Sequence, residues 1–239
     1  MGFFCPATGS AEITVDWAAF ALSLELAGVT ALVLLPFGVA AGRALAARAF
    51  AGKGLVQALL ALPLVLPPSV LGYYLLVAFG IASPLSRVWQ ALFGHPLAFS
   101  FSGLVFASLI VNLPFAVQPI ERAFAAIAPE IREAAWVCGL SRWAGFLRIE
   151  LPLAWPGILA AFALTVAHTM GEFGVVLMVG GGIPGETRTV AIAIYDRAQA
   201  LDGSGAGRMS LLLLAFALAA LGLVQILGGR VGGRDGRDG

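Results

Sequence analysis

Residues 55–79 read Leu-Val-Gln-Ala-Leu-Leu-Ala-Leu-Pro-Leu-Val-Leu-Pro-Pro-Ser-Val-Leu-Gly-Tyr-Tyr-Leu-Leu-Val-Ala-Phe and contain no charged side chain. A helix needs about 20 mostly apolar residues to cross the hydrocarbon core of a bilayer. Four more apolar stretches of similar length occupy residues 20–42, 98–119, 153–179 and 209–228. These runs are too long and too uniformly apolar for the alternating strands of a β-barrel. We therefore predict an all-α integral membrane protein with about five transmembrane helices.

The composition agrees with a lipid environment. Of the 239 residues, 60% are hydrophobic and 11% are charged, and the mean hydropathy is +0.95. Soluble domains carry roughly 25% charged residues, so too few polar side chains remain here to cover a surface that faces water. A mass of 24.7 kDa leaves room for one helical bundle, but not for a bundle and a catalytic domain.

The basic residues are divided unequally between the two sides of the predicted spans. One side receives Arg43, Arg48, Lys53, Arg122, Arg132, Arg142, Arg148, Arg230, Arg234 and Arg237. The other side receives Arg87, Arg188, Arg197 and Arg208. Cytoplasmic loops carry the excess of Lys and Arg. We therefore place the larger group in the cytoplasm, with the N-terminus outside and the C-terminus inside.

This orientation divides the chain into three parts. Residues 1–16 are predicted to form a short external tail, and residues 17–229 a single transmembrane domain. Residues 230–239 are rich in Gly, Arg and Asp and are predicted to be a disordered cytoplasmic tail. Within the domain, the charged stretch 120–152 is the long cytoplasmic loop.

Prolines interrupt the second span at Pro63, Pro67 and Pro68, next to Ser69. Each proline removes an intrahelical hydrogen bond and tends to kink the helix. Proline is common in membrane helices, so an incidental break is one interpretation. A broken helix is tolerated in lipid where the freed carbonyls face protein or a watery cavity, which makes this span a candidate wall of a pathway.

The cytoplasmic loop has the local signals of two short helices separated by a turn. Pro129 suits the first position of a helix, and Gly139 suits a left-handed stop at its end. Ser141 can cap a second helix. We expect Pro152 to end that helix and to start the next span.

The same loop contains Glu-Ala-Ala, then three residues, a Gly, nine residues and Ile-x-Leu-Pro. This pattern resembles the coupling-loop signature of bacterial ABC-importer permeases, which implies the type I ABC-importer permease fold. In that family the loop inserts a short helix into a groove of an ATPase subunit. The residues that match the signature are Glu133, Ala134, Ala135, Gly139, Ile149, Leu151 and Pro152. The resemblance implies two copies of an ABC ATPase and an external substrate-binding protein as partners.

Two further stretches narrow the resemblance. Residues 62–76 resemble the second span of molybdate permeases. Gly171-Glu-Phe-Gly174, followed by residues 183–189 and Ile194-Tyr195, resembles the same family in the part beyond its coupling loop. The resemblance implies a permease subunit of the bacterial inner membrane that translocates an oxyanion, with molybdate as the first expectation. Sulfate and tungstate permeases have similar segments and remain alternatives. Residues expected at a pathway or gate are Pro67, Pro68, Ser69, Gly171, Glu172 and Gly174.

An ATPase site is not expected on this chain. The single lysine, Lys53, follows Ala47 at the spacing of a phosphate-binding loop, but that motif requires Gly at the first position and Ser or Thr after the lysine. Neither His95 nor His168 is accompanied by an acidic cluster. We expect no catalytic residue, metal site, bound cofactor or nucleic-acid partner; ATP and Mg would belong to the partner ATPase.

Other functions remain open at this stage. His168 and Glu172 lie one turn apart in the fourth span and would serve a proton-coupled transporter as a relay, or form a plain polar pair. A non-transporting membrane scaffold is a further alternative. External Arg188 and Arg197 either attract an oxyanion or belong to a solvated loop. Because five helices are too few to enclose a path, we expect a lipid-embedded homodimer with a two-fold axis.

Overall fold

The computed structural model describes residues 15–232, and within that range every regular element is helical. The described helices that are long and apolar enough to cross a membrane are Trp17–Ala47 (α1), Phe101–Ala125 (α5), Arg142–Gly171 and Gly203–Leu223. A bent pair, α2 (Lys53–Val65) and α3 (Pro68–Phe79), adds a fifth crossing if it is counted as one span. The prediction of an all-α membrane protein with about five spans is confirmed.

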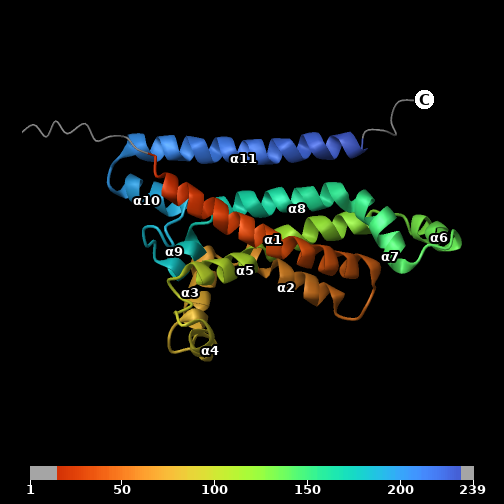
Figure 1. Cartoon of the computed structure of the whole chain (residues 1–239), viewed down its shortest axis with the longest axis horizontal. Helices are drawn as coiled ribbons and strands as arrows, with labels where there is room; N and C mark the ends of the chain where they lie inside the picture. The colour runs from red at the N-terminus through yellow and green to blue at the C-terminus, as the bar shows by residue number, and fades with distance from the viewer. Residues whose placement is uncertain (1–14, 233–239) are drawn as a thin grey trace, which may run out of the picture.

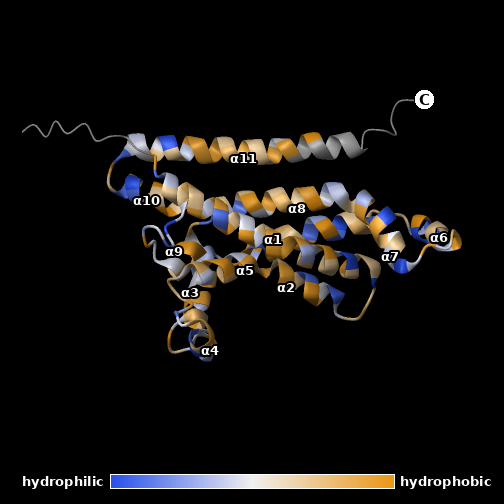
Figure 2. Cartoon of the chain, viewed as in Figure 1, coloured by the Kyte–Doolittle hydropathy of each residue, from blue (hydrophilic) through white to orange (hydrophobic). Residues whose placement is uncertain are grey.

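The long helices run side by side, and the short ones gather at the two ends of the bundle (Figure 1). Helices α6 and α7 lie at one end, near the C-terminus of α1 and the N-terminus of α2. Helices α3, α4, α9 and α10 lie toward the other end. Figure 2 shows apolar colouring along most of α8 and α11, with hydrophilic residues near α6, α7 and α10. The bundle therefore has an apolar middle and two polar ends.

Helix α1 packs so closely on α5 that the backbones of the two helices are in contact at Gly38 and Gly42. A Cβ atom added to Gly38 would lie 3.0 Å from the carbonyl oxygen of Ala116, and one added to Gly42 would lie 2.9 Å from the backbone nitrogen of Glu121. Small residues four positions apart let membrane helices approach this closely. The side chain of Phe124 on α5 is fully buried nearby. These two helices, with α8, form the centre of the fold.

The predicted second span, 55–79, is two helices and not one. Helix α2 ends at Val65, α3 begins at Pro68, and the two meet at 104°. Pro67 and Pro68 have no N–H to continue the helical ladder, and a residue that precedes proline is pushed toward extended backbone. Leu66 and Pro67 accordingly have ψ values of 137° and 134°.

The predicted fourth span, 153–179, also ends early. Helix α8 stops at Gly171, Glu172 is extended with a ψ of 125°, and a separate helix α9 (Gly174–Gly180) follows. Helix α9 packs on α3. The apolar run is therefore divided between a long helix and a short one, because the side chain of Glu172 caps the short helix.

Pro152 does not end a helix, contrary to our expectation. Three segments follow one another directly: α7 (Arg142–Gly145), the π-helical η1 (Phe146–Glu150) and α8 (Leu151–Gly171). The N–H of Leu151 reaches back five residues to the carbonyl of Phe146. A π-helical turn of this kind shifts the hydrogen-bond pattern just before Pro152 and so accommodates its missing N–H. The helix therefore continues through the proline into the membrane.

The remaining helices are α4 (Pro84–Phe93), α6 (Pro129–Val137), α10 (Val190–Gln199) and α11 (Gly203–Gly232). Helix α4 was not expected from the sequence; Ser83 caps it by accepting a hydrogen bond of 3.0 Å from the N–H of Ser86. Helix α10 contains Ile194 and Tyr195 of the family resemblance, and α11 continues past the predicted end of the fifth span at 228. The predictions for residues 1–14 and 233–239 lie outside the described residues.

Candidate functional site

Helix α6 is the exposed short helix that contains Glu133, Ala134 and Ala135, the first of the predicted docking residues. Pro129 takes its first position, and Glu130 lies in the first turn, where a negative charge is favourable. Gly139 has a φ of +78°, and its N–H donates to the carbonyl of Trp136 at 2.9 Å. The N–H of Leu140 donates to the carbonyl of Ala135 at 3.1 Å. This is a Schellman stop, and it confirms the expected left-handed turn at Gly139.

The predicted docking residues fall into two groups. Glu133, Ala134 and Gly139 are exposed on or directly after α6, whereas Ala135 is buried beneath it. The second group is Ile149 in η1, with Leu151 and Pro152 at the start of α8. Two large apolar side chains on α6 were missed: Trp136 is 56% exposed and Val137 is 88% exposed. Their signal in the sequence is large apolar residues within a charged loop.

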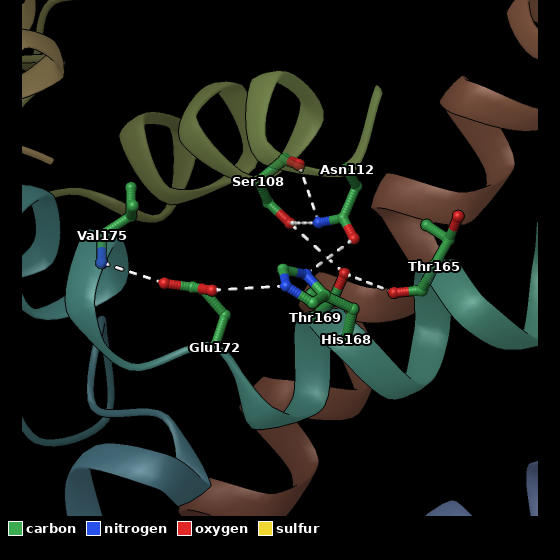
Figure 3. Close-up of polar contacts among 7 residues, drawn as sticks. All are labelled: Ser108, Asn112, Thr165, His168, Thr169, Glu172 and Val175. Atoms are coloured by element: carbon green, nitrogen blue, oxygen red, sulfur yellow. Dashed lines mark hydrogen bonds and ion pairs between the residues drawn. The ribbon is translucent and has the colours of Figure 1, made fainter. Parts of the chain in front are cut away.

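A second group of functional candidates is a buried polar cluster at the junction of α1, α5 and α8 (Figure 3). The hydroxyl of Thr30 donates to Oγ of Ser108 at 3.0 Å. Nδ2 of Asn112 donates to the carbonyl oxygen of Ser108 at 2.9 Å and to its Oγ at 3.2 Å. The hydroxyls of Ser108 and Thr169 are 3.5 Å apart. Every member is buried, so the cluster satisfies its own polar groups inside the bundle.

His168 and Glu172 extend this cluster toward α9. Because Nδ2 of Asn112 faces Ser108, its Oδ1 faces Nδ1 of His168 at 3.2 Å, and Nδ1 must be the donor. Nε2 of His168 then lies 3.7 Å from Oε2 of Glu172, so attraction between the two requires a proton between them. Phe115 stacks on the imidazole with ring centroids 4.2 Å apart. The other carboxylate oxygen of Glu172 accepts a hydrogen bond of 3.0 Å from the N–H of Val175.

The residues predicted at a pathway or gate are only partly brought together. Pro68, His168 and Glu172 line a cavity of about 130 Å³ between α2, α3, α5 and α8. Gly174 lies against Pro68, where an added Cβ would approach the ring to 2.7 Å. The remaining three, Pro67, Ser69 and Gly171, are exposed around the two breaks. Asn112 and Ser108 were missed, because single polar residues in an apolar run carry no motif.

A second cavity, of about 430 Å³, lies between α2 and α5 toward the end that holds α6. Its polar lining includes Gln57, Gln118, Glu121 and Arg122. Nε2 of Gln57 donates to Oε1 of Glu121 at 2.6 Å, and Nζ of Lys53 is 3.8 Å from the same oxygen. Polar side chains are therefore available on both helices along this face.

The arginines considered for oxyanion attraction are held by acidic neighbours at the opposite end. Arg188 pairs with Asp196 at 3.0 Å and with Asp16 at 3.9 Å. Nη1 of Arg197 donates to Asp202 at 3.0 Å. Both arginines therefore have acidic partners within this end of the bundle.

A bundle of apolar membrane helices that presents a capped, exposed helix at one polar end defines a class: the membrane subunits of binding-protein-dependent importers. The chain belongs to the family described as "Binding-protein-dependent transport system inner membrane component", which matches residues 35–232. Its members are transport components, which agrees with a subunit that has no catalytic site of its own.

Three relatives place the chain within this family. It is 47% identical over 187 residues to the molybdenum transport system permease protein ModB of Azotobacter vinelandii, covering 78% of this chain and 83% of the relative. It is 38% identical over 207 residues to the protein of the same name from Escherichia coli (strain K12), covering 86% and 90%. The sulfate transport system permease protein CysT of Escherichia coli (strain K12) is 30% identical over 217 residues, covering 91% and 78%.

A solved structure shares the fold: a bacterial ABC transporter involved in the import of the acidic polysaccharide alginate. It matches with a TM-score of 0.72 at 18% identity, over 90% of this chain and 79% of that chain. The predicted ABC-importer permease family and the type I importer fold are both confirmed.

Proposed function

We propose that this chain is the membrane-spanning subunit of an ABC importer for molybdate. The observation that carries the proposal is the graded similarity to relatives: 47% and 38% identity to two molybdenum permeases, against 30% to a sulfate permease of similar coverage. Tungstate and sulfate are the alternative substrates. All three are tetrahedral dianions, so a soluble binding protein outside the membrane would set most of the choice between them.

The ATPase is a separate polypeptide. Two copies bind the permease dimer, one at the α6 helix of each permease chain. Support comes from the form of this helix, which begins at Pro129, is closed at its C-terminus by the turn at Gly139, and presents Trp136 and Val137 to solvent. Aromatic side chains are enriched at the core of protein interfaces, so the exposed Trp136 suits a docking surface. Docking at this end places α6 in the cytoplasm and the N-terminus outside, in agreement with the distribution of basic residues.

The importer is a homodimer of this chain. Helix α2 has no buried residue in the single chain, although its composition is strongly apolar. Leu55, Leu59 and Val65 on α2, and Tyr73 and Tyr74 on α3, are all more than half exposed. A second copy that covers this face would enclose the space beside α2 and α5 between two chains. Lipid would cover the apolar faces of α11.

The translocation path then follows the face that carries both cavities. The larger cavity, with Gln57 and Glu121, lies toward the cytoplasmic end, and the smaller one, with Pro68 and Glu172, lies at the breaks between helices. We place the gate at these breaks. A carboxylate repels an oxyanion, so Glu172 shapes the gate and does not bind substrate. Weak binding along the path suits transport, because the substrate must leave as readily as it enters.

The decisive experiment is uptake of radiolabelled molybdate into vesicles that contain this chain, its ATPase and its binding protein. ATP-dependent uptake that tungstate blocks, and sulfate does not, supports the proposal. Uptake that sulfate blocks would show that the chain is a sulfate permease. Uptake that ignores ATP and follows a proton gradient contradicts the importer and supports the alternative in which His168 and Glu172 relay protons.

A further inference from the structure

Glu150 holds an ion pair that joins distant parts of the chain. It lies in the π-helical segment η1, at the unspecified position between Ile149 and Leu151 of the family pattern, and it is 8% exposed. Arg43 near the end of α1 donates to both of its carboxylate oxygens, from Nε at 2.7 Å and from Nη2 at 3.0 Å. Paired N–H donation to a carboxylate is the strongest arrangement of this kind and fixes direction as well as distance.

A second arginine connects the same carboxylate to α6. Nε of Arg132 lies 4.0 Å from Oε2 of Glu150, and Nη2 of Arg132 donates to the carbonyl oxygen of Phe124 at 2.8 Å. Nε of Arg132 is buried and makes no hydrogen bond, so its contact with Glu150 is an ion pair only. The guanidinium of Arg43 also lies 4.8 Å from the ring centre of Phe146. One carboxylate, at the end of η1 and directly before α8, therefore faces cations from α1 and from α6.

We propose that Glu150 is the joint through which movement of α6 reaches the membrane helices. This inference rests on the proposed function, in which an ATPase moves α6. A shift of α6 carries Arg132 with it, and Glu150 transmits the shift to α1 through Arg43 and to α8 directly. Segment η1 suits such a joint, because π-helical turns hold an alternative hydrogen-bond register.

Helix α8 then acts as the lever. From Glu150 to Glu172 is 22 residues, 172 minus 150, which is about 33 Å of helix at 1.5 Å per residue. Glu172 lies at the break beside the smaller cavity and caps α9. A displacement that enters at Glu150 therefore leaves at the gate. On this account Glu150 is a positioning residue for coupling, and it touches neither ATP nor substrate.

The test measures molybdate imported per ATP hydrolysed by the whole complex in vesicles. In Glu150→Gln the ATPase still copurifies, because α6 keeps its exposed face, but import per ATP falls about tenfold, within the range usual for coupling between sites. Arg132→Gln, which leaves the pair of Glu150 with Arg43 in place, lowers the ratio in the same way. Asp196→Asn removes the carboxylate of an ion pair at the opposite end and leaves the ratio unchanged.

The double variant Arg43→Gln/Glu150→Gln distinguishes a role of Glu150 in coupling from a role in stability alone. It removes both members of the closest ion pair and leaves Arg132 with the carbonyl oxygen of Phe124, so thermal unfolding in detergent returns part of the way toward the wild-type midpoint. If Glu150 couples the two ends, import per ATP stays low in this variant although part of the stability is restored. A normal ratio in the double variant, or in Glu150→Gln, overturns the inference. Absence of ATP-driven uptake by the wild-type complex instead overturns the proposed function.

Discussion

Glu172 has two contacts at the break between α8 and α9: one oxygen accepts from the N–H of Val175 and the other faces His168. Glu172→Ala leaves that N–H without a partner, and we expect it to destabilise the protein by about 1 kcal/mol, the usual effect of losing a helix cap. Glu172→Gln keeps an oxygen for the cap and should cost less. Thermal unfolding in detergent measures both, and equal losses would show that the charge matters more than the cap.

Gly139 owes its role to backbone conformation. Its φ is +78°, and an added Cβ would meet nothing within 4 Å. Left-handed backbone costs most residues about 1–2 kcal/mol, whereas Asn adopts it readily. We expect Gly139→Val to weaken copurification of the ATPase and Gly139→Asn to retain it. Equal loss with Asn would mean that the partner approaches too closely for any side chain.

At the scale of elements, the contact between α3 and α9 depends on the absence of a side chain at Gly174. An added Cβ would lie 2.7 Å from Cβ of Pro68, whose ring is rigid. We expect Gly174→Ala to force the two helices apart, at the cost of about 1–3 kcal/mol that is usual for overpacking. Unfolding in detergent and molybdate uptake would both report the change.

The matched control is Gly171→Ala, three residues earlier, where nothing lies within 4 Å of the added Cβ. Alanine also favours helix over glycine by about 1 kcal/mol. This variant should therefore unfold at or above the wild-type temperature. The sequence could not separate these two glycines, since both belong to the same short motif; only the position of Pro68 distinguishes them. Equal destabilisation of the two variants would contradict the close contact.

For the whole molecule, the proposed orientation in the membrane can be tested by labelling one cysteine. Cys138 is exposed directly after α6. In a Cys5→Ser background expressed without the ATPase, a membrane-impermeant maleimide should label Cys138 in inside-out vesicles and not in intact cells. Ser204→Cys, at the opposite end and with both native cysteines replaced by serine, should give the reverse result. Labelling of Cys138 from outside would invert the topology and remove the docking proposal.

Local signals accounted for much of the architecture. The apolar runs predicted the membrane helices, and Pro129 with Gly139 predicted the bounds of α6. These local signals misplaced helix ends where the hydrogen-bond pattern changes around a proline or a carboxylate. Pro152 lies within a continuous helix because η1 absorbs its missing hydrogen bond, and Glu172 divides an apolar run because it caps α9.

The sequence by itself determined that this chain is a helical membrane protein of the importer family with a capped helix for docking. It could do so because a backbone in lipid must satisfy its hydrogen bonds within each segment, so composition and caps act locally. The tertiary structure alone decided which polar groups meet. Arg43 reaches Glu150 across 107 positions, and Asn112 reaches His168 across 56. Such pairs depend on how separate helices pack, and no local pattern encodes that.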